Sequence, residues 1–157
     1  MNHTRTSVLT MQNRDFFLVA QEFLGQGKHV RFLLKGNSML PFLRQGDLVC
    51  LHAATAGDLR LGEIVLVNWK GSFILHRLVF ATARYLYLAG DNNLFRIEKV
   101  ERDCVIARVI WVHREDRPLA NPGGWGRFLG LLWFASRPIR WIINVLTKKL
   151  QNHEIEK

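Results

Sequence analysis

The spacing of hydrophobic positions predicts a helix near the start of the chain. In "DFFLVAQEFLGQG", apolar residues recur every three or four positions, which is the period of an α-helix. Asp15 is placed to cap the first turn, and the glycines at 25 and 27 favour an end to the helix there. The expected buried face comprises Phe16, Val19, Ala20 and Phe23.

Between residues 29 and 114 the pattern changes to short segments typical of strands. They are rich in Val, Ile, Leu and aromatic residues, and turn sequences such as "RQGD" and "WKGS" separate them. The predicted strands lie in "HVRFLLK", "DLVCLH", "EIVLVNW", "SFILHRLVF", "RYLYLAG" and "CVIARVIWVHR". This succession predicts a mainly β fold, an antiparallel sheet or small barrel, and not alternating βαβ units.

The segment after residue 114 has a different character. Residues 115–126 hold two prolines and three glycines, which is typical of a linker. Residues 127–150 show a basic amphipathic helical pattern, which Pro138 is expected to divide into two pieces. Its apolar stripe comprises Phe128, Leu131, Leu132, Ala135, Ile139, Ile142, Ile143 and Leu146. The expected organisation is an N-terminal segment with a short helix (1–28), a β-rich core (29–114), the linker (115–126), the helical tail (127–150) and a polar end (151–157).

Charge and composition favour a membrane surface as the partner of this tail. The chain is 48% hydrophobic and 22% charged, as expected of a folded protein, and its net charge is +9. The basic excess is densest after residue 120, while the longest uncharged stretch there, "FLGLLWFAS", is far shorter than the ~20 residues that span a bilayer. A basic amphipathic helix with Trp133 and Trp141 fits a segment lying in an anionic membrane surface. The alternative is that the stripe packs on the β core.

Several other functions are not expected. Cys50 and Cys104 lie in apolar segments and are expected to be buried free thiols, not a disulfide framework or a metal site, and no cofactor is predicted. The basic charge would permit nucleic acid binding, but the strands lack the alternation of aromatic and basic residues of an RNA-binding sheet. The first 15 residues contain no continuous apolar stretch, so we expect no secretory signal and a cytoplasmic protein.

Candidate chemistry is concentrated in three segments, "GNSMLPFLRQGDLV", "LGEIVLVNWKGSFILHRLV" and "LAGDNN". Ser38 follows a glycine-containing loop and is constrained downstream by Pro41, which suits a nucleophile held on a stiff loop. Side chains alternate along "FILHRLVF", so His76 shares one face with three hydrophobic residues. Burial on that face favours the neutral imidazole, which is the form that a general base requires.

Each of these residues also has a structural interpretation. A lone histidine on an apolar face is most often a core residue, and Asp91 in "GDNN" is well placed to cap its own turn. In the catalytic interpretation, Asp91 at a strand end orients the His76 ring and stabilises its protonated form. Lys70 lies six residues before His76 in a predicted hairpin turn, which makes it a poor substitute base.

In this order and spacing, the three segments resemble the signal peptidase family of serine proteases (the S24/S26 type). Residues 35–93 show its Ser-Met-x-Pro, Gly-Asp/Glu-Ile-Val and Gly-Asp-Asn sequences. A histidine at position 76 is similar to the Ser-His-Asp branch of endoplasmic-reticulum and sporulation-type enzymes, since the bacterial secretory enzymes carry lysine there. The resemblance implies an antiparallel β catalytic core like that of the SOS repressors and substrate bound as an extended strand. It also implies catalytic roles for Ser38, His76 and Asp91, and an oxyanion and substrate site at Asn37, Met39 and Pro41.

Two positions depart from the pattern of that family. Gly36 stands where many relatives have a serine that donates to the oxyanion, so backbone N–H groups at the nucleophile are expected to form the hole. Ile97 stands where histidine-type relatives often have a second aspartate, and Glu98 is beside it. The carboxylate that orients His76 is therefore open between Asp91 and Glu98.

Together these features predict a membrane-peripheral serine endopeptidase that cleaves leader or precursor peptides through an acyl-enzyme. Two alternatives stay open. A self-cleaving regulator of the SOS-repressor type shares the serine segment and core fold, but it needs a lysine base and usually an N-terminal DNA-binding domain, for which the region before residue 29 is short. The other alternative is a non-catalytic peptide-binding or membrane-peripheral module on a degenerate peptidase fold.

Overall fold

The computed structural model describes residues 13–115, 117–119 and 124–155, and predictions that fall on residues 1–12, 116, 120–123 and 156–157 lie outside them. In chain order the elements are α1 (Asn13–Gly25), β1 (Val30–Leu33), β2 (Leu48–Ala53), β3 (Ile64–Trp69), β4 (Ser72–Ala81), β5 (Tyr85–Ala89), β6 (Glu98–Glu101), the 3₁₀ turn η1 (Arg102–Cys104), β7 (Val105–Arg114), β8 (Arg117–Pro118), α2 (Trp125–Ala135) and α3 (Arg137–Ile155).

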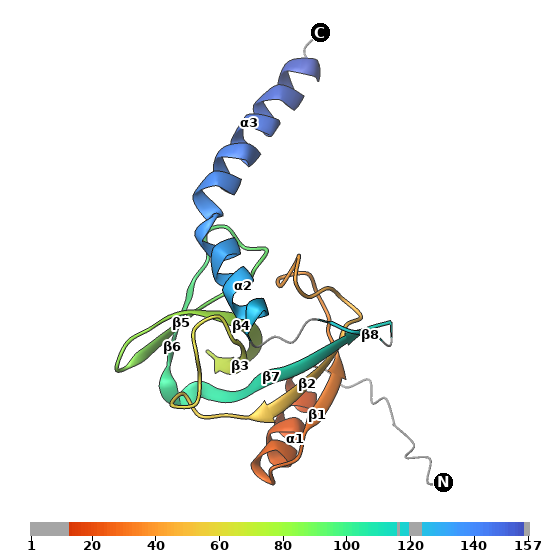
Figure 1. Ribbon diagram of the computed structural model, residues 1–157, viewed down its shortest axis with the longest axis vertical. Coiled ribbons are helices and arrows are strands. Elements are labelled where there is room, and N and C mark those ends of the chain that lie inside the picture. The colour runs from red at the N-terminus through yellow and green to blue at the C-terminus, as the bar shows by residue number, and fades with distance from the viewer. Residues whose placement is uncertain (1–12, 116, 120–123, 156–157) are drawn as a thin grey trace.

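The mainly β prediction is confirmed, because the described strands pair antiparallel in one curled sheet (Figure 1). Their order is β1-β2-β7-β3-β4-β5-β6, and β8 pairs with the end of β7. Each of the predicted strand segments contains a strand of the sheet. The hydrophobic pattern does not predict β6 or β8, because β6 has four residues of which Val100 alone is hydrophobic and β8 has only two residues.

Side chains of the sheet form two hydrophobic clusters, which lie on opposite faces of β4. Leu75 belongs to the cluster under α1. Leu78 belongs to the other cluster, formed with β3, β5 and β6, and Ile74 packs against that second cluster. The predicted alternation along β4 is therefore confirmed. It places His76 on the same side of the strand as Ile74 and Leu78.

The predicted helix is present, but its start and its buried face differ from the expectation. It begins at Asn13, so Asp15 lies inside the first turn and is not the N-cap. Phe17, Ala20 and Leu24 are buried, while Val19 and Phe23 are exposed. Both sets have helical spacing because apolar residues occupy most positions of this segment. Stacking of the Phe17 ring on Phe73 of β4, with 5.1 Å between ring centroids, accompanies the choice of face.

The C-terminal region forms two helices, as the proline predicts. α2 ends at Ala135 and α3 begins at Arg137, with Pro138 in its first turn, where a missing N–H costs no hydrogen bond. Within the described residues, no helix combines the length and the apolar character needed to cross a bilayer. The predicted linker contains β8 and the start of α2, and α3 continues to Ile155, beyond the predicted end of the tail.

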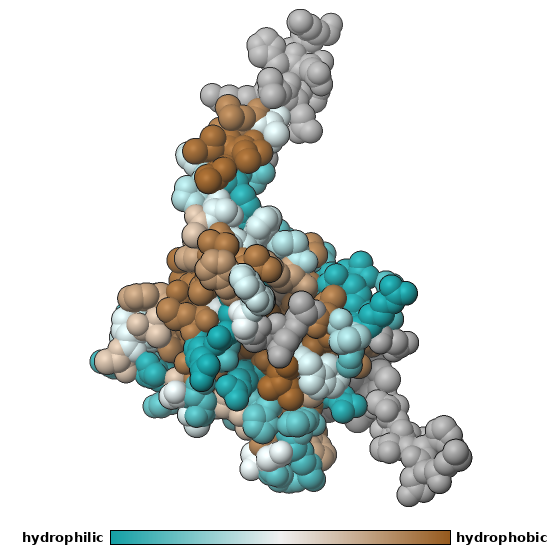
Figure 2. Space-filling model, in the orientation of Figure 1, coloured by the Kyte–Doolittle hydropathy of each residue, from teal (hydrophilic) through white to brown (hydrophobic). Residues whose placement is uncertain are grey.

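α3 projects away from the sheet as an arm, which Figure 1 shows at the top of the molecule. The predicted stripe on this helix is not covered by the described part of the core, because Ile139, Ile142, Ile143 and Leu146 are each at least half exposed. Figure 2 shows hydrophobic surface along the arm. The alternative, in which the stripe packs on the β core, is therefore wrong for the part of the stripe on α3.

Candidate active site

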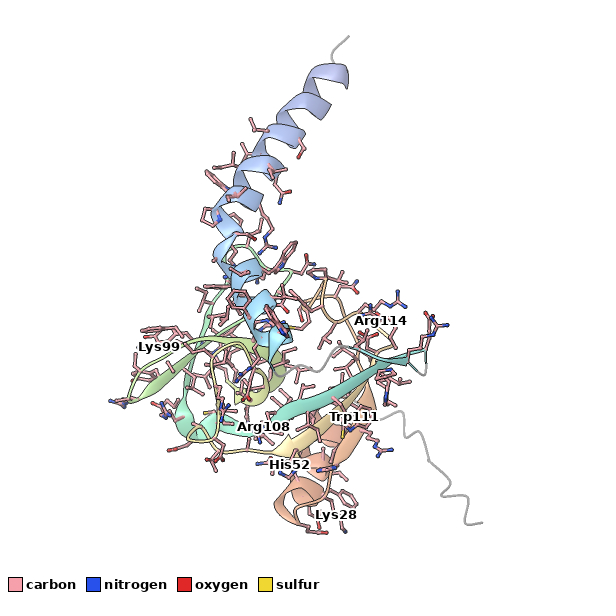
Figure 3. The ribbon with its side chains drawn as sticks, in the orientation of Figure 1. Lys28, His52, Lys99, Arg108, Trp111 and Arg114 are labelled. Carbon is pink, nitrogen blue, oxygen red and sulfur yellow. The ribbon has the colours of Figure 1, made fainter. Side chains whose placement is uncertain are left out.

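Ser38 is exposed on a loop whose two ends are tied together. At its base, the N–H of Leu34 donates to the carbonyl oxygen of Asp47 (2.8 Å), and the N–H of Gly46 donates back to Leu34 (2.9 Å). The Asp47 carboxylate accepts two 2.8 Å hydrogen bonds from Arg114, at the end of β7 (Figure 3). Paired backbone and charge-assisted hydrogen bonds restrict the loop, so the serine is presented on a constrained platform.

The residues around Ser38 divide into anchors and surface groups. The Met39 side chain is buried in the larger hydrophobic cluster, so it holds the loop to the core and does not face a substrate at the surface. Asn37 and Pro41 are exposed beside the serine. Gly36 adopts a φ of 86°, a backbone conformation that side-chain-bearing residues rarely adopt.

His76 lies on β4 and is only 9% exposed. Its Nδ1 atom is 3.0 Å from Oε2 of Glu98, the first residue of β6. The other carboxylate oxygen of Glu98 lies 3.0 Å from Nε of Arg96. A buried carboxylate on Nδ1 fixes the orientation of the ring and leaves Nε2 for chemistry.

The serine loop and the histidine ring meet at Gly90. A Cβ atom added to Gly90 would lie 2.8 Å from the carbonyl oxygen of Ser38 and 3.1 Å from Nε2 of His76. The N–H of Asn92 donates to the same Ser38 carbonyl oxygen at 2.9 Å. The main chain of Ser38 and the Nε2 edge of His76 are therefore neighbours, although within the described residues no hydrogen bond joins the serine hydroxyl to the ring.

Asp91 has a different partner from the one that the sequence suggested. Its carboxylate accepts hydrogen bonds from Nε (2.8 Å) and Nη2 (2.6 Å) of Arg77, and Nη1 of Arg77 donates to the carbonyl oxygen of Gly62 (2.7 Å). Burial raises the pKa of Asp91, and Arg77 opposes that effect. Of the two carboxylates left open by the sequence, Glu98 contacts the histidine. Asp91 pairs with Arg77 instead, and among the described residues no hydrogen bond joins its carboxylate to the histidine ring.

The sequence interpretation gave no role to Arg77, which is fully buried. A charged residue inside an otherwise apolar strand is the signal that could have revealed it, because a buried charge requires a partner. Its guanidinium also lies 4.8 Å from the centroid of the Phe42 ring. Lys70, by contrast, lies at the tip of the β3–β4 hairpin with its Nζ 4.9 Å from the Trp69 ring centroid.

An open pocket of about 400 Å³ adjoins the nucleophile candidate. It is lined by Ser38, Asn92, Asn93, Leu94 and Phe95. The phenyl ring of Phe95 is largely exposed, and the asparagines supply amide groups beside it. A shallow pocket with apolar and amide walls next to a serine suits a peptide side chain and its backbone.

The two cysteines are free thiols. Cys50 is buried as expected, and burial raises the pKa of its thiol, which leaves it a weak nucleophile. Cys104 is only partly buried, in η1 before β7. Over the part of the chain that the structure describes, no three His, Cys, Asp or Glu side chains come together as a metal site.

The sequence matches one protein family. A family model described as Peptidase S24-like matches residues 5–110, more than half of the chain. The matched residues include the loop of Ser38, strand β4 with His76 and strand β6 with Glu98. The match ends within β7. A search of curated proteins found no match.

Proposed function

Because the chain belongs to the Peptidase S24-like family, we propose that it is a serine endopeptidase with Ser38 as nucleophile and His76 as general base. Its substrates are leader or precursor peptides, cleaved through an acyl-enzyme. The observation that supports this most directly is the arrangement at Gly90, where the Ser38 carbonyl oxygen and Nε2 of His76 both lie close to the glycine while Glu98 contacts Nδ1. The family model supports a serine-peptidase type of fold, and the residue roles are our proposal.

In the proposed reaction, Ser38 Oγ attacks the scissile carbonyl carbon and its proton moves to Nε2 of His76. Glu98 stabilises the imidazolium through Nδ1, and backbone N–H groups at Asn37 and Ser38 stabilise the oxyanion. The imidazolium then protonates the leaving amine, which departs and leaves an ester on Ser38. Water, deprotonated by His76, then attacks that ester; the C–Oγ bond breaks, the carboxylic acid product leaves and the imidazolium returns the proton to Ser38 Oγ. Substrate binding brings the hydroxyl to hydrogen-bond distance of the ring, a tightening common in peptidases.

A histidine base favours the signal-peptidase type of chemistry over the SOS-repressor type within this proposal. The repressor type needs a lysine base. The lysine nearest to His76 in the sequence, Lys70, lies at a hairpin tip. The pocket beside Ser38 is shallow and open, which suits an extended peptide bound across the surface. A non-catalytic peptide-binding module is the alternative, and it requires that Ser38 be unreactive.

Active-site labelling tests the proposal. A fluorophosphonate probe phosphonylates activated serines with loss of fluoride, so the wild-type protein should be labelled and Ser38→Ala should not. Ser72→Ala removes another exposed serine, on β4, and should label like the wild type. Mass spectrometry should find the adduct on Ser38. An unlabelled wild-type protein at several pH values would leave the non-catalytic module as the function.

We also propose that the arm lies on an anionic membrane surface. Ile142 and Ile143 are half exposed and Trp141 lies beside them, while residues 120–157 carry an excess of basic over acidic residues. Trp133 does not take part, because its indole points to the core and donates to Asp91. This surface is proposed for α3 alone.

Vesicle sedimentation tests the membrane proposal. The wild-type protein should sediment with vesicles that contain phosphatidylglycerol and less with pure phosphatidylcholine. Replacing both Ile142 and Ile143 by aspartate should abolish this binding. Leu33→Asp alters an equally exposed leucine on β1 and should leave it unchanged. Equal sedimentation of the arm variant and the wild type would contradict the proposal.

A further inference from the structure

The junction between α2 and α3 donates hydrogen bonds to two consecutive carbonyl groups beside the candidate active site. Nε1 of Trp133 donates to the carbonyl oxygen of Asp91 at 2.8 Å, and Nη2 of Arg137 donates to that of Gly90 at 3.1 Å. Nη1 of Arg140 also reaches the Asp91 oxygen, at 3.3 Å. Two helices therefore hold the main chain of one short turn.

That turn is the one that contacts both proposed catalytic groups. The N–H of Asn92 donates to the Ser38 carbonyl oxygen, and a Cβ atom added to Gly90 would lie within 2.8 Å of that oxygen and 3.1 Å of Nε2 of His76. A displacement of Gly90 or Asp91 would move the serine backbone relative to the ring. The hydrogen bonds from the helices oppose such a displacement.

The donors are themselves fixed by packing. Arg137 is 8% exposed, and its guanidinium lies 4.3 Å from the centroid of the Phe134 ring. The Arg140 guanidinium lies 4.1 Å from the Trp133 ring centroid, and its Nη2 donates to the Trp133 carbonyl oxygen at 3.1 Å. Placing two arginines in a helix junction costs desolvation, and their hydrogen bonds to the turn offset part of that cost.

The family match ends at residue 110, so both helices lie outside it. We infer that Trp133 and Arg137 are positioning residues: they hold the Gly90–Asn92 turn so that Ser38 faces Nε2 of His76. This inference rests on the proposed peptidase function. It makes the base of the C-terminal helices a part of the catalytic apparatus, while the exposed remainder of α3 is free for other contacts.

The test uses the full chain and measures how fast a fluorophosphonate probe modifies Ser38 as a function of probe concentration. Trp133→Phe keeps an aromatic ring but removes the indole N–H and its hydrogen bond, and Arg137→Ala removes the other hydrogen bond. A nucleophile displaced by about 1 Å typically loses ~100-fold in rate, so we expect the maximal modification rate to fall about tenfold or more. The probe concentration for half-maximal rate should stay within about twofold, because the pocket residues are unchanged.

Matched controls for both substitutions lie on α2. Trp125→Phe changes an exposed tryptophan, and Arg127→Ala removes an arginine that makes no contact with the Gly90–Asn92 turn among the described residues. Both should react at the wild-type rate. Thermal unfolding of each variant and the final fraction of protein labelled at Ser38 report how much of the variant is folded. A slower reaction of Ser38 is thereby distinguished from a smaller folded population.

Each outcome decides one of the two proposals. A wild-type protein that is not modified at Ser38 would contradict the peptidase function itself. A modified wild type with Trp133→Phe and Arg137→Ala at the wild-type rate would overturn the positioning role and leave the peptidase intact. A loss explained fully by a smaller folded fraction would also overturn it. If Arg137→Ala does not fold, the milder Trp133→Phe decides alone.

Discussion

Gly130 of α2 lies directly against the guanidinium of Arg77, with no space for a side chain between them. A Cβ atom at this position would overlap the guanidinium carbon and nitrogens. Since Arg77 holds Asp91, the close approach of the helix completes the burial of this ion pair. A glycine in a helix interior costs about 1 kcal/mol relative to alanine, so its position here is explained by packing.

Gly130→Ala should therefore destabilise the protein, although alanine normally favours a helix. Overpacking of this kind costs about 1–3 kcal/mol. Chemical denaturation should show a lower free energy of unfolding. Gly57→Ala is the control, because a Cβ there would make only an ordinary contact, 3.7 Å from the Thr55 hydroxyl. Equal destabilisation by both substitutions would contradict the packing argument.

Glu98→Gln should slow modification of Ser38 by the fluorophosphonate probe. The amide is close to the same size but no longer stabilises a protonated His76, and general-base assistance is worth about 100- to 10,000-fold. The measurement is the maximal modification rate at neutral pH. Glu101→Gln, at an exposed position in the same strand, should have no effect. An unchanged rate for Glu98→Gln would remove Glu98 from the site.

Asp91→Asn should act mainly on stability. Removing one partner of a buried ion pair leaves Arg77 uncompensated, which costs about 3–5 kcal/mol. Urea unfolding should show this loss at neutral pH. In the remaining folded protein, Ser38 modification should be slowed less than in Glu98→Gln, since Glu98 and not Asp91 hydrogen-bonds His76. A larger slowing by Asp91→Asn than by Glu98→Gln, with unchanged stability, would restore Asp91 to the role that the sequence suggested.

Asp47 should contribute to acid unfolding. Burial alone would raise the pKa of this carboxyl, but hydrogen bonds from Arg114 and from the N–H of Arg44 outweigh it and hold the pKa below the ordinary 3.8. A lowered pKa in the folded state means that the contribution is complete above about pH 4 to 5 and is lost as the pH falls through the folded-state value. The free energy of unfolding, measured from pH 2 to pH 7, should therefore fall at the acid end less steeply in Asp47→Asn than in the wild type. The exposed Asp103→Asn should follow the wild-type curve.

Local patterns were sufficient for much of the fold. The strands from β1 to β5 and β7 have the apolar runs and turn residues that a single sequence displays, and Pro138 marks the division of the tail. The predicted buried face of α1 was wrong because two overlapping apolar faces have the same period, and tertiary contacts such as that of Phe17 with Phe73 distinguish them. Periodicity defines a helix but does not choose between such faces.

The partners of the charged groups required the tertiary structure. Ser38 and His76 could be selected from their segments, but which carboxylate reaches the ring depends on the pairing of β5 with β6, which aligns Leu88 with Glu98. β6 is too short and polar to be predicted as a strand. The contacts of Trp133 and Arg137 with the Gly90–Asn92 turn join parts of the chain more than 40 residues apart, and no spacing in the sequence encodes them.

The hydrogen atom that serves as the side chain of Gly90 sets the clearance between the nucleophile loop and the imidazole. Even a single methyl group would wedge these two parts of the molecule apart, since it would come within 2.8 Å of one and 3.1 Å of the other. Saturation mutagenesis scored by peptide hydrolysis would consequently find position 90 intolerant of every replacement. Such intolerance would arise from lack of room, with no chemical group of its own at stake.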